Sequence, residues 1–144
     1  MKATIFSLIL FLLLFLGCDD SNVNPNANFE NGLKLHLDKT IFNINEPIIS
    51  TLSNQTNLSA FLYHCGFKFT PDIERKENNS WIYYYSPICP AVYPSGATEF
   101  EAFKETKEIN FINKPGIYRL KLSYSFYNIN NLDKSLYSEE FTID

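Results

Sequence analysis

The sequence has little of what phosphate-binding and nucleic-acid-binding proteins need. Its 5 glycines are scattered, so no glycine-rich loop is available to surround a phosphate group. Its 12 lysines and arginines are outnumbered by 16 acidic side chains, for a formal net charge of −4, and they form no basic run. A mildly acidic chain of this kind is a poor candidate for binding nucleic acid, and we expect none as a partner.

A hydrophobic run long enough to span a membrane is also missing. The longest apolar run extends from Ile5 to Leu16 and is interrupted only by Ser7, whereas a spanning helix needs about 20 residues. Lys2 precedes this run and the small residue Gly17 follows it, which is the layout of a secretory signal peptide. The sequence therefore predicts that residues 1–17 are removed during export.

The cleavage region, Phe15-Leu16-Gly17-Cys18, resembles the lipobox of bacterial lipoproteins, although the usual Leu at its first position is replaced by Phe15. The resemblance implies cleavage before Cys18 and acylation of that residue, with palmitate among the chains. Several acyl chains would anchor the protein firmly, because one chain alone holds only marginally. The alternative is an ordinary signal peptide followed by an incidental cysteine.

The residues after Cys18 bear on location and on domain organisation. Asp19 and Asp20 resemble the export signal of some surface lipoproteins, although Asp in the first of these positions also resembles an inner-membrane retention signal. We expect a lipid-anchored protein of the cell envelope, with the outer membrane favoured over the inner membrane. Residues 18–32 are polar, with Pro25 in their middle, and predict a flexible tether. One folded domain is expected over residues 33–144.

The remaining sequence predicts an all-β fold. Leu33, Leu35 and Leu37 alternate with polar residues that include His36, which is expected to face water. No segment has a sustained helical period. Seven to nine short strands indicate a β-sandwich. The main strands are expected at 33–38, 40–44, 47–54, 58–65, 67–76, 80–85, 117–126 and 136–143; residues 98–103 and 109–112 form extended pieces around a charged segment at 104–108.

Three cysteines are present, of which Cys18 is assigned to the lipid. Cys65 and Cys89 are then an even pair in an oxidising compartment, which predicts a disulfide. The bridge would hold the proline-rich loop 86–96 against the sheet. A metal site made by His64 with the two cysteines is the alternative, but it lacks the close ligand spacing of zinc and copper motifs.

The segment from Lys114 to Leu120 resembles the corner of Ig-like domains, where a tyrosine hydroxyl bonds back to the preceding loop. Tyr118 would be that tyrosine, and Leu120 stands where antibody domains have a cysteine. A wider set of motifs resembles bacterial Ig-like domains of small lipoproteins: Leu37-Asp38-Lys39-Thr40, Glu46-Pro47-Ile48, Thr51-Leu52-Ser53-Asn54, Cys65-Gly66, Trp81 and Cys89. The resemblance implies an Ig-like β-sandwich and no defined activity.

Residue types used in catalysis are present without a recognisable arrangement. Ser, His and Asp residues occur outside any nucleophile-elbow motif. Glu99 and Glu101 alternate with Phe100, so they would share one strand face. Such a pair can serve as acid and base in a glycosidase, but a solvated strand face is the simpler interpretation. We expect neither an enzyme nor a cofactor.

Five consecutive residues, Trp81-Ile82-Tyr83-Tyr84-Tyr85, form the most distinctive cluster. If this strand is regular, Trp81, Tyr83 and Tyr85 share one face, and Tyr93 in the following loop would extend it. The rings would form a binding platform for a sugar or a protein; alternatively, Trp81 packs in the core near the disulfide.

Together these features predict a membrane-anchored, non-catalytic binding or adaptor domain whose partner is an envelope protein or a glycan. The alternative is a protease inhibitor that presents loop 86–96, because a loop held rigid by prolines and a disulfide loses little entropy on binding.

Overall fold

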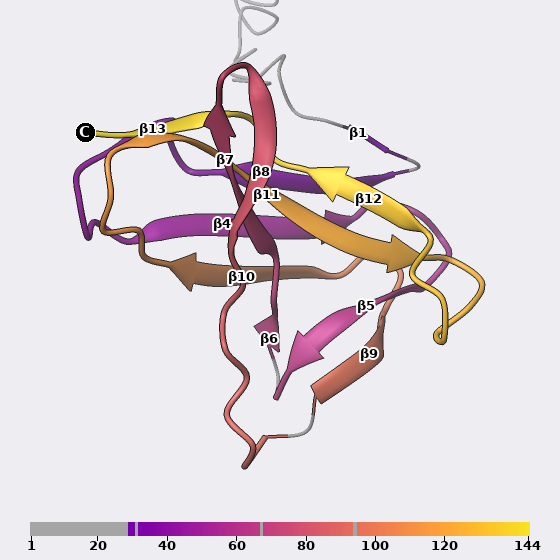
Figure 1. The fold of residues 1–144 in the computed structure, drawn as a ribbon. Coiled ribbons are helices and arrows are strands. Elements are labelled where there is room, and N and C mark those ends of the chain that lie inside the picture. Colours follow the sequence, from indigo (N-terminus) through magenta and orange to yellow (C-terminus); the bar gives the residue numbers. More distant parts are fainter. Residues whose placement is uncertain (1–28, 31, 67, 94) are drawn as a thin grey trace, which may run out of the picture.

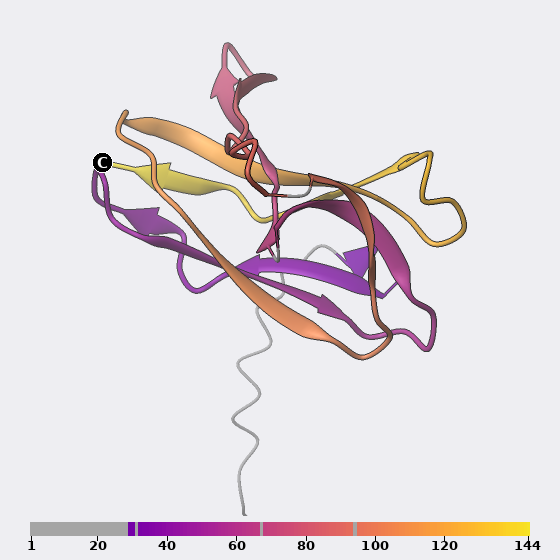
Figure 2. The ribbon, with the colours of Figure 1, turned by 90° about the horizontal axis from the view of Figure 1, so that it is seen from below.

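The computed structural model describes residues 29–30, 32–66, 68–93 and 95–144. The signal peptide, Cys18 and most of the expected tether lie outside these residues. The described chain consists of thirteen strands in two sheets that form the two layers of a sandwich (Figures 1 and 2). In this part of the chain, no helix is long and apolar enough to cross a membrane.

The smaller sheet, sheet A, is antiparallel and has the order β1-β2-β4-β10. Its strands are β1 (Phe29–Glu30), β2 (Leu33–Leu37), β4 (Ile48–Asn54) and β10 (Glu105–Asn110). Every second residue of β2 is buried, as the leucine alternation predicts. β1 lies within residues 18–32, which were expected to form the tether. Its backbone pairs with that of β2, so this end of the segment is part of sheet A.

The larger sheet, sheet B, is built around the ten-residue strand β11 (Gly116–Ser125). One edge of β11 pairs with β12 (Lys134–Tyr137) and β13 (Phe141–Ile143), and the other edge pairs with β5 (Ala60–Cys65) and β7 (Asp72–Glu77). β5 also pairs with β6 (Lys68–Phe69) and β9 (Ser95–Phe100), and β7 with β8 (Ser80–Tyr85). β13 pairs in parallel with β3 (Ile41–Phe42).

The core lies between the inner faces of the two sheets. Sheet A contributes Leu33, Leu35 and Leu52, each with no exposed surface, and β11 contributes Leu120 and other alternate residues. Burying one such side chain contributes roughly 1.5–3 kcal/mol. The apolar residues of the alternating pattern thus all face one continuous apolar interior.

The corner before β11 confirms a specific prediction. The fully buried Tyr118 donates a hydrogen bond from its hydroxyl to the carbonyl oxygen of Lys114, with 2.8 Å between the oxygens, and its ring stacks on Phe141 at 5.9 Å. Burial raises the pKa of Tyr118 to about 12, so the hydroxyl remains a donor at neutral pH. With the two-sheet arrangement, this corner confirms an Ig-like β-sandwich.

Four segments differ from the sequence expectation. The expected strand 67–76 is divided into β6 and β7, which pair with different strands. The charged segment 104–108 lies mostly in β10, an edge strand whose exposed side carries Glu105 and Lys107; charges are common on such edges because they prevent pairing with other chains. Strand β9 begins at Ser95, inside the loop predicted for residues 86–96. The last predicted strand is divided between β12 and β13, because the carboxylate of Glu139 turns inward and accepts a hydrogen bond from the backbone N–H of Leu37 at 3.0 Å.

Candidate functional site

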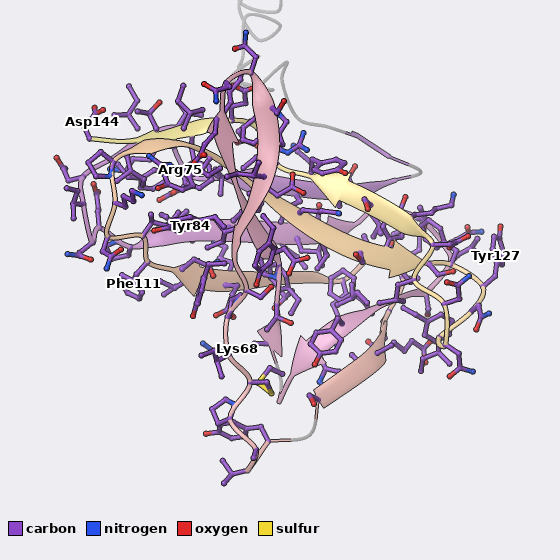
Figure 3. The ribbon with its side chains drawn as sticks, viewed as in Figure 1. Lys68, Arg75, Tyr84, Phe111, Tyr127 and Asp144 are labelled. Atoms are coloured by element: carbon purple, nitrogen blue, oxygen red, sulfur yellow. A yellow bond between two sulfur atoms is a disulfide. The ribbon has the colours of Figure 1, made fainter. Side chains whose placement is uncertain are left out.

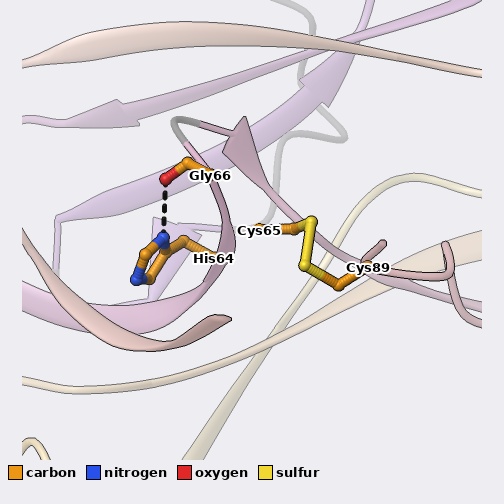
Figure 4. The surroundings of a disulfide bond; sticks show 4 residues. All are labelled: His64, Cys65, Gly66 and Cys89. Carbon is orange, nitrogen blue, oxygen red and sulfur yellow. Dashed lines mark hydrogen bonds between the residues drawn. A yellow bond between two sulfur atoms is a disulfide. The ribbon is translucent and has the colours of Figure 1, made fainter. Parts of the chain in front are cut away.

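The predicted disulfide is present. Cys65 ends β5, Cys89 lies in the loop after β8, and their Cα atoms are 5.4 Å apart (Figure 4). His64 does not approach the sulfur atoms to form a ligand set; its Nδ1 lies 2.8 Å from the carbonyl oxygen of Gly66. The alternative metal site is therefore not formed, and the described residues contain no group of three metal-binding side chains.

The loop over residues 86–93 lies at one end of the molecule (Figure 1). It exposes several large apolar side chains. Ile88 is 82% exposed, Val92 is 83% exposed and Tyr93 is 54% exposed. The loop is fixed by the disulfide, by a hydrogen bond between the Ser86 hydroxyl and Asp72, and by an internal bond from the N–H of Tyr93 to the carbonyl of Pro90 at 2.9 Å. The loop backbone is thus fixed in one conformation, and its apolar side chains remain exposed to solvent.

A pocket of about 450 Å³ lies between this loop and β6. Its walls are mainly apolar and include Phe69, Pro87, Ile88, Pro90 and Tyr93. One ion pair also borders the pocket: Lys68 Nζ lies 3.2 Å from Glu108 Oε1, and Figure 3 shows Lys68 near the disulfide. An apolar pocket with a few polar groups is the usual form of a binding site.

The second oxygen of Glu108 lies behind the ion pair, in the protein interior. Oε2 is buried and has no hydrogen-bond partner among the described residues, although such an atom normally costs about 1–3 kcal/mol when unpaired.

The aromatic residues of β8 do not form the single platform that was expected. β7 and β8 form a hairpin whose turn residues Asn78 and Asn79 have φ values of 49° and 63°, as in a type I′ turn. A bulge between Ile73 and Glu74 then places Tyr83 opposite Glu74 but Tyr85 opposite the buried Ile73. Tyr85 thereby leaves the face of Trp81 and Tyr83, which strict alternation could not predict.

Trp81 lies outside the buried core. Its ring contacts the guanidinium of Arg119, whose Cζ is 4.4 Å from the ring centroid, and the same guanidinium lies 4.0 Å from the ring of Tyr137. Arg119 also pairs with Glu74 at 2.6 Å. This arrangement holds Trp81 on the outside of sheet B. The alternative prediction, that Trp81 packs in the core near the disulfide, is therefore wrong.

Three other candidate positions, Glu99, Glu101 and His36, lie away from both the disulfide and the aromatic cluster. Glu99 and Glu101 are both exposed, and Glu101 lies 3.6 Å from Lys104, as expected for a solvated strand face. His36 is only partly exposed, and its Nδ1 is buried without a partner among the described residues. It does not face open water as the alternation implied.

A second cleft, of about 510 Å³, combines two residues of the aromatic cluster with four residues that the sequence analysis did not select. It is lined by Asn45 from the turn after β3, by Tyr84 and Tyr85 from β8, and by Phe111, Ile112 and Asn113 from the connection between β10 and β11. Figure 3 shows Tyr84 and Phe111 on the same side of the molecule. Tyr84 and Tyr85 belong to the aromatic cluster noted in the sequence, whereas no local pattern marked Asn45 or the segment from Phe111 to Asn113.

This chain has little similarity to known proteins. No family model and no curated protein matches this chain. Two solved structures are similar at 11% identity: the Pseudomonas fluorescens alkylpurine DNA glycosylase AlkC bound to DNA with an abasic-site analogue (TM-score 0.38, 76% of this chain and 29% of that chain) and PapD-like domain 7 of human CEP192 (TM-score 0.41, 89% of this chain and 96% of that chain). At these values neither likeness bears on function.

Proposed function

We propose that this chain is a lipid-anchored, non-catalytic binding domain of the bacterial cell envelope, and that it binds a partner protein through loop 86–93. The observation that carries the proposal is the exposure of Ile88, Val92 and Tyr93 on a loop held by the Cys65–Cys89 bridge beside an apolar pocket.

The energetics of the loop support a binding role. Apolar surface in water is unfavourable by about 25 cal/mol per Å² relative to a buried state, so a partner that covers Ile88 and Val92 gains this free energy. The disulfide and the Ser86–Asp72 bond already limit the freedom of the loop, which lowers the entropy lost on binding. Exposed apolar patches rimmed by polar groups are typical of protein-interaction surfaces.

The partner site is tested by photo-crosslinking in the intact envelope, with a benzophenone amino acid placed at Val92 in one variant and at Tyr127 in another. The two positions are a matched pair because each is 83% exposed. We expect a discrete crosslinked band from position 92 and none from position 127. Equal crosslinking from both positions, or none from position 92, contradicts the proposed binding surface.

The anchor is a separate part of the proposal and rests on the Gly17-Cys18 junction. We expect Cys18→Ser to leave the protein unprocessed or to release it from the membrane fraction. A Cys18→Ser protein that is processed and membrane-bound like the unchanged chain would contradict lipidation without affecting the loop proposal.

Protease inhibition is the second candidate, because Ile88 projects into solvent next to the bridged Cys89, as a bait residue on a rigid loop would. Titration of broad-specificity proteases with the purified domain separates the two functions. Stoichiometric inhibition that is lost in Ile88→Asp would favour the inhibitor; unimpeded proteolysis of a test substrate would leave the adaptor function.

A further inference from the structure

We propose that the second cleft, formed by Asn45, Tyr84, Tyr85, Phe111, Ile112 and Asn113, binds a ring of a neutral sugar. None of these residues lines the pocket beside the disulfide. The inference therefore goes beyond the proposed protein-binding loop and stands or falls independently of it.

The chemistry of the lining selects the ligand class. Phe111 is 59% exposed and Tyr85 is 41% exposed, so both rings offer apolar surface to a ligand. A pyranose has an apolar face of C–H groups that packs on an aromatic ring, while its hydroxyls remain at the edge. Aromatic side chains with a polar group suit a ligand that is apolar on one side and wet on the other.

Two amides provide the polar part of the cleft. The side chains of Asn45 and Asn113 are exposed and make no hydrogen bond within the described chain. Each amide combines an acceptor with two donors, which matches a hydroxyl that both donates and accepts. No Asp, Glu, Lys, Arg or His lines the cleft, so nothing there offsets the charge of an anionic or cationic ligand.

The cleft is held in shape before any ligand arrives. Asn45 has a φ of 61°, and its N–H donates to the carbonyl of Ile112 at 2.9 Å, which joins the turn after β3 to the segment before β11. Residues kept in such sparsely populated conformations often lie at binding sites. Glu46 stabilises the same turn by accepting the N–H of Asn43 at 2.8 Å.

The aromatic wall is fixed from behind. Tyr84 packs edge-on against the buried Tyr118, with 5.3 Å between ring centroids, and the bulge in β8 brings Tyr85 to the same side. Ile112, which is 3% exposed, forms the floor. A rigid cleft of rings and amides needs little reorganisation to bind a rigid sugar ring.

The experiment is a calorimetric titration of the domain from residue 18 onward with soluble hexasaccharides: cellohexaose, maltohexaose, mannohexaose, chitohexaose and, as an anionic probe, hexagalacturonate. We expect at least one neutral probe to bind with a Kd of about 1 mM or tighter. Phe111→Ala should weaken that binding at least ~10-fold, which is about 1.4 kcal/mol, and Asn113→Ala should weaken it several-fold.

Tyr83→Ala is the matched control, because Tyr83 is 65% exposed but lies outside the cleft. It should bind the probe like the unchanged domain, as should Ile88→Ser in the protein-binding loop. The inference is overturned if no neutral probe binds, if only hexagalacturonate binds, or if Phe111→Ala leaves the affinity unchanged. Loss of sugar binding in Tyr83→Ala would also overturn it, in favour of the outer face of β8.

Discussion

Loop 86–93 and the corner from Lys114 to Tyr118 are both connections between strands, but they are held in different ways. The corner places a large ring in the core, where Tyr118 is fully buried and its hydroxyl bonds to the carbonyl of Lys114. The loop directs Ile88 and Val92 into water and is held by the Cys65–Cys89 bridge.

The difference shows what a segment gives up when it presents apolar side chains to solvent. Side chains that point outward contribute no packing, so the backbone needs another constraint to keep one conformation. A disulfide provides this constraint in an oxidising compartment, whereas the corner relies on packing and a hydrogen bond. If this is correct, the two connections should respond differently to substitution, reduction and pH.

The largest effect is expected from Cys65→Ala/Cys89→Ala. The bridge closes a loop with a sequence separation of 24 residues, and the chain-entropy model assigns roughly 3 to 4 kcal/mol to such a closure. Chemical denaturation should show a correspondingly lower free energy of unfolding, and limited proteolysis should cut first within residues 86–93. Unchanged stability together with first cleavage at the Tyr118 corner would reverse the comparison.

A smaller effect is expected from Tyr118→Phe. The substitution keeps the ring in its buried position and removes only the hydrogen bond to Lys114, so the free energy of unfolding should fall by about 1 kcal/mol. Loop 86–93 should keep its protease resistance, because its bridge is intact. A denaturant midpoint equal to that of the unchanged domain would show that the corner bond contributes nothing.

The stability difference between Tyr118→Phe and the unchanged domain should itself depend on pH. The pKa of Tyr118 is raised from 10.0 to about 12 by burial, so the folded state keeps its proton where the unfolded state loses it. The contribution of the hydroxyl is therefore complete below pH 10 and declines as pH rises toward 12. Denaturation curves measured at pH 8 and pH 11 should show the difference shrinking; a constant difference would contradict the shifted pKa.

The smallest effect on stability is expected from Ile88→Ser. Ile88 is 82% exposed, so its replacement should change the free energy of unfolding by no more than about 0.5 kcal/mol. Crosslinking from position 92 should nevertheless weaken in Ile88→Ser. A loss of more than ~2 kcal/mol would mean that the loop is held by packing like the corner.

Residues close together in the chain were the predictable part of this fold. The alternation around Leu33 and along β11 and the Tyr118 corner follow from local patterns of side chains. The disulfide was predictable as well, because only two cysteines remained once Cys18 was assigned.

The aromatic cluster was only partly predictable, because alternation assumes a regular strand. The extra residue at the bulge opposite Ile73 and Glu74 moves Tyr85 away from Trp81 and toward Phe111. The charged segment that became β10 was misread for a related reason: an edge strand with one solvated side needs few apolar residues.

By itself, the sequence determined the β class, the pairing of Cys65 with Cys89 and the buried corner tyrosine, because each depends on local periodicity or on residues with one available role. Only the tertiary structure decided which apolar residues remain in water and which turns meet at a cleft. Asn45 and Asn113 are far apart in the chain, and the bond from the N–H of Asn45 to the carbonyl of Ile112 brings their turns together. Such a contact depends on how the two sheets stack, which no short stretch of sequence encodes.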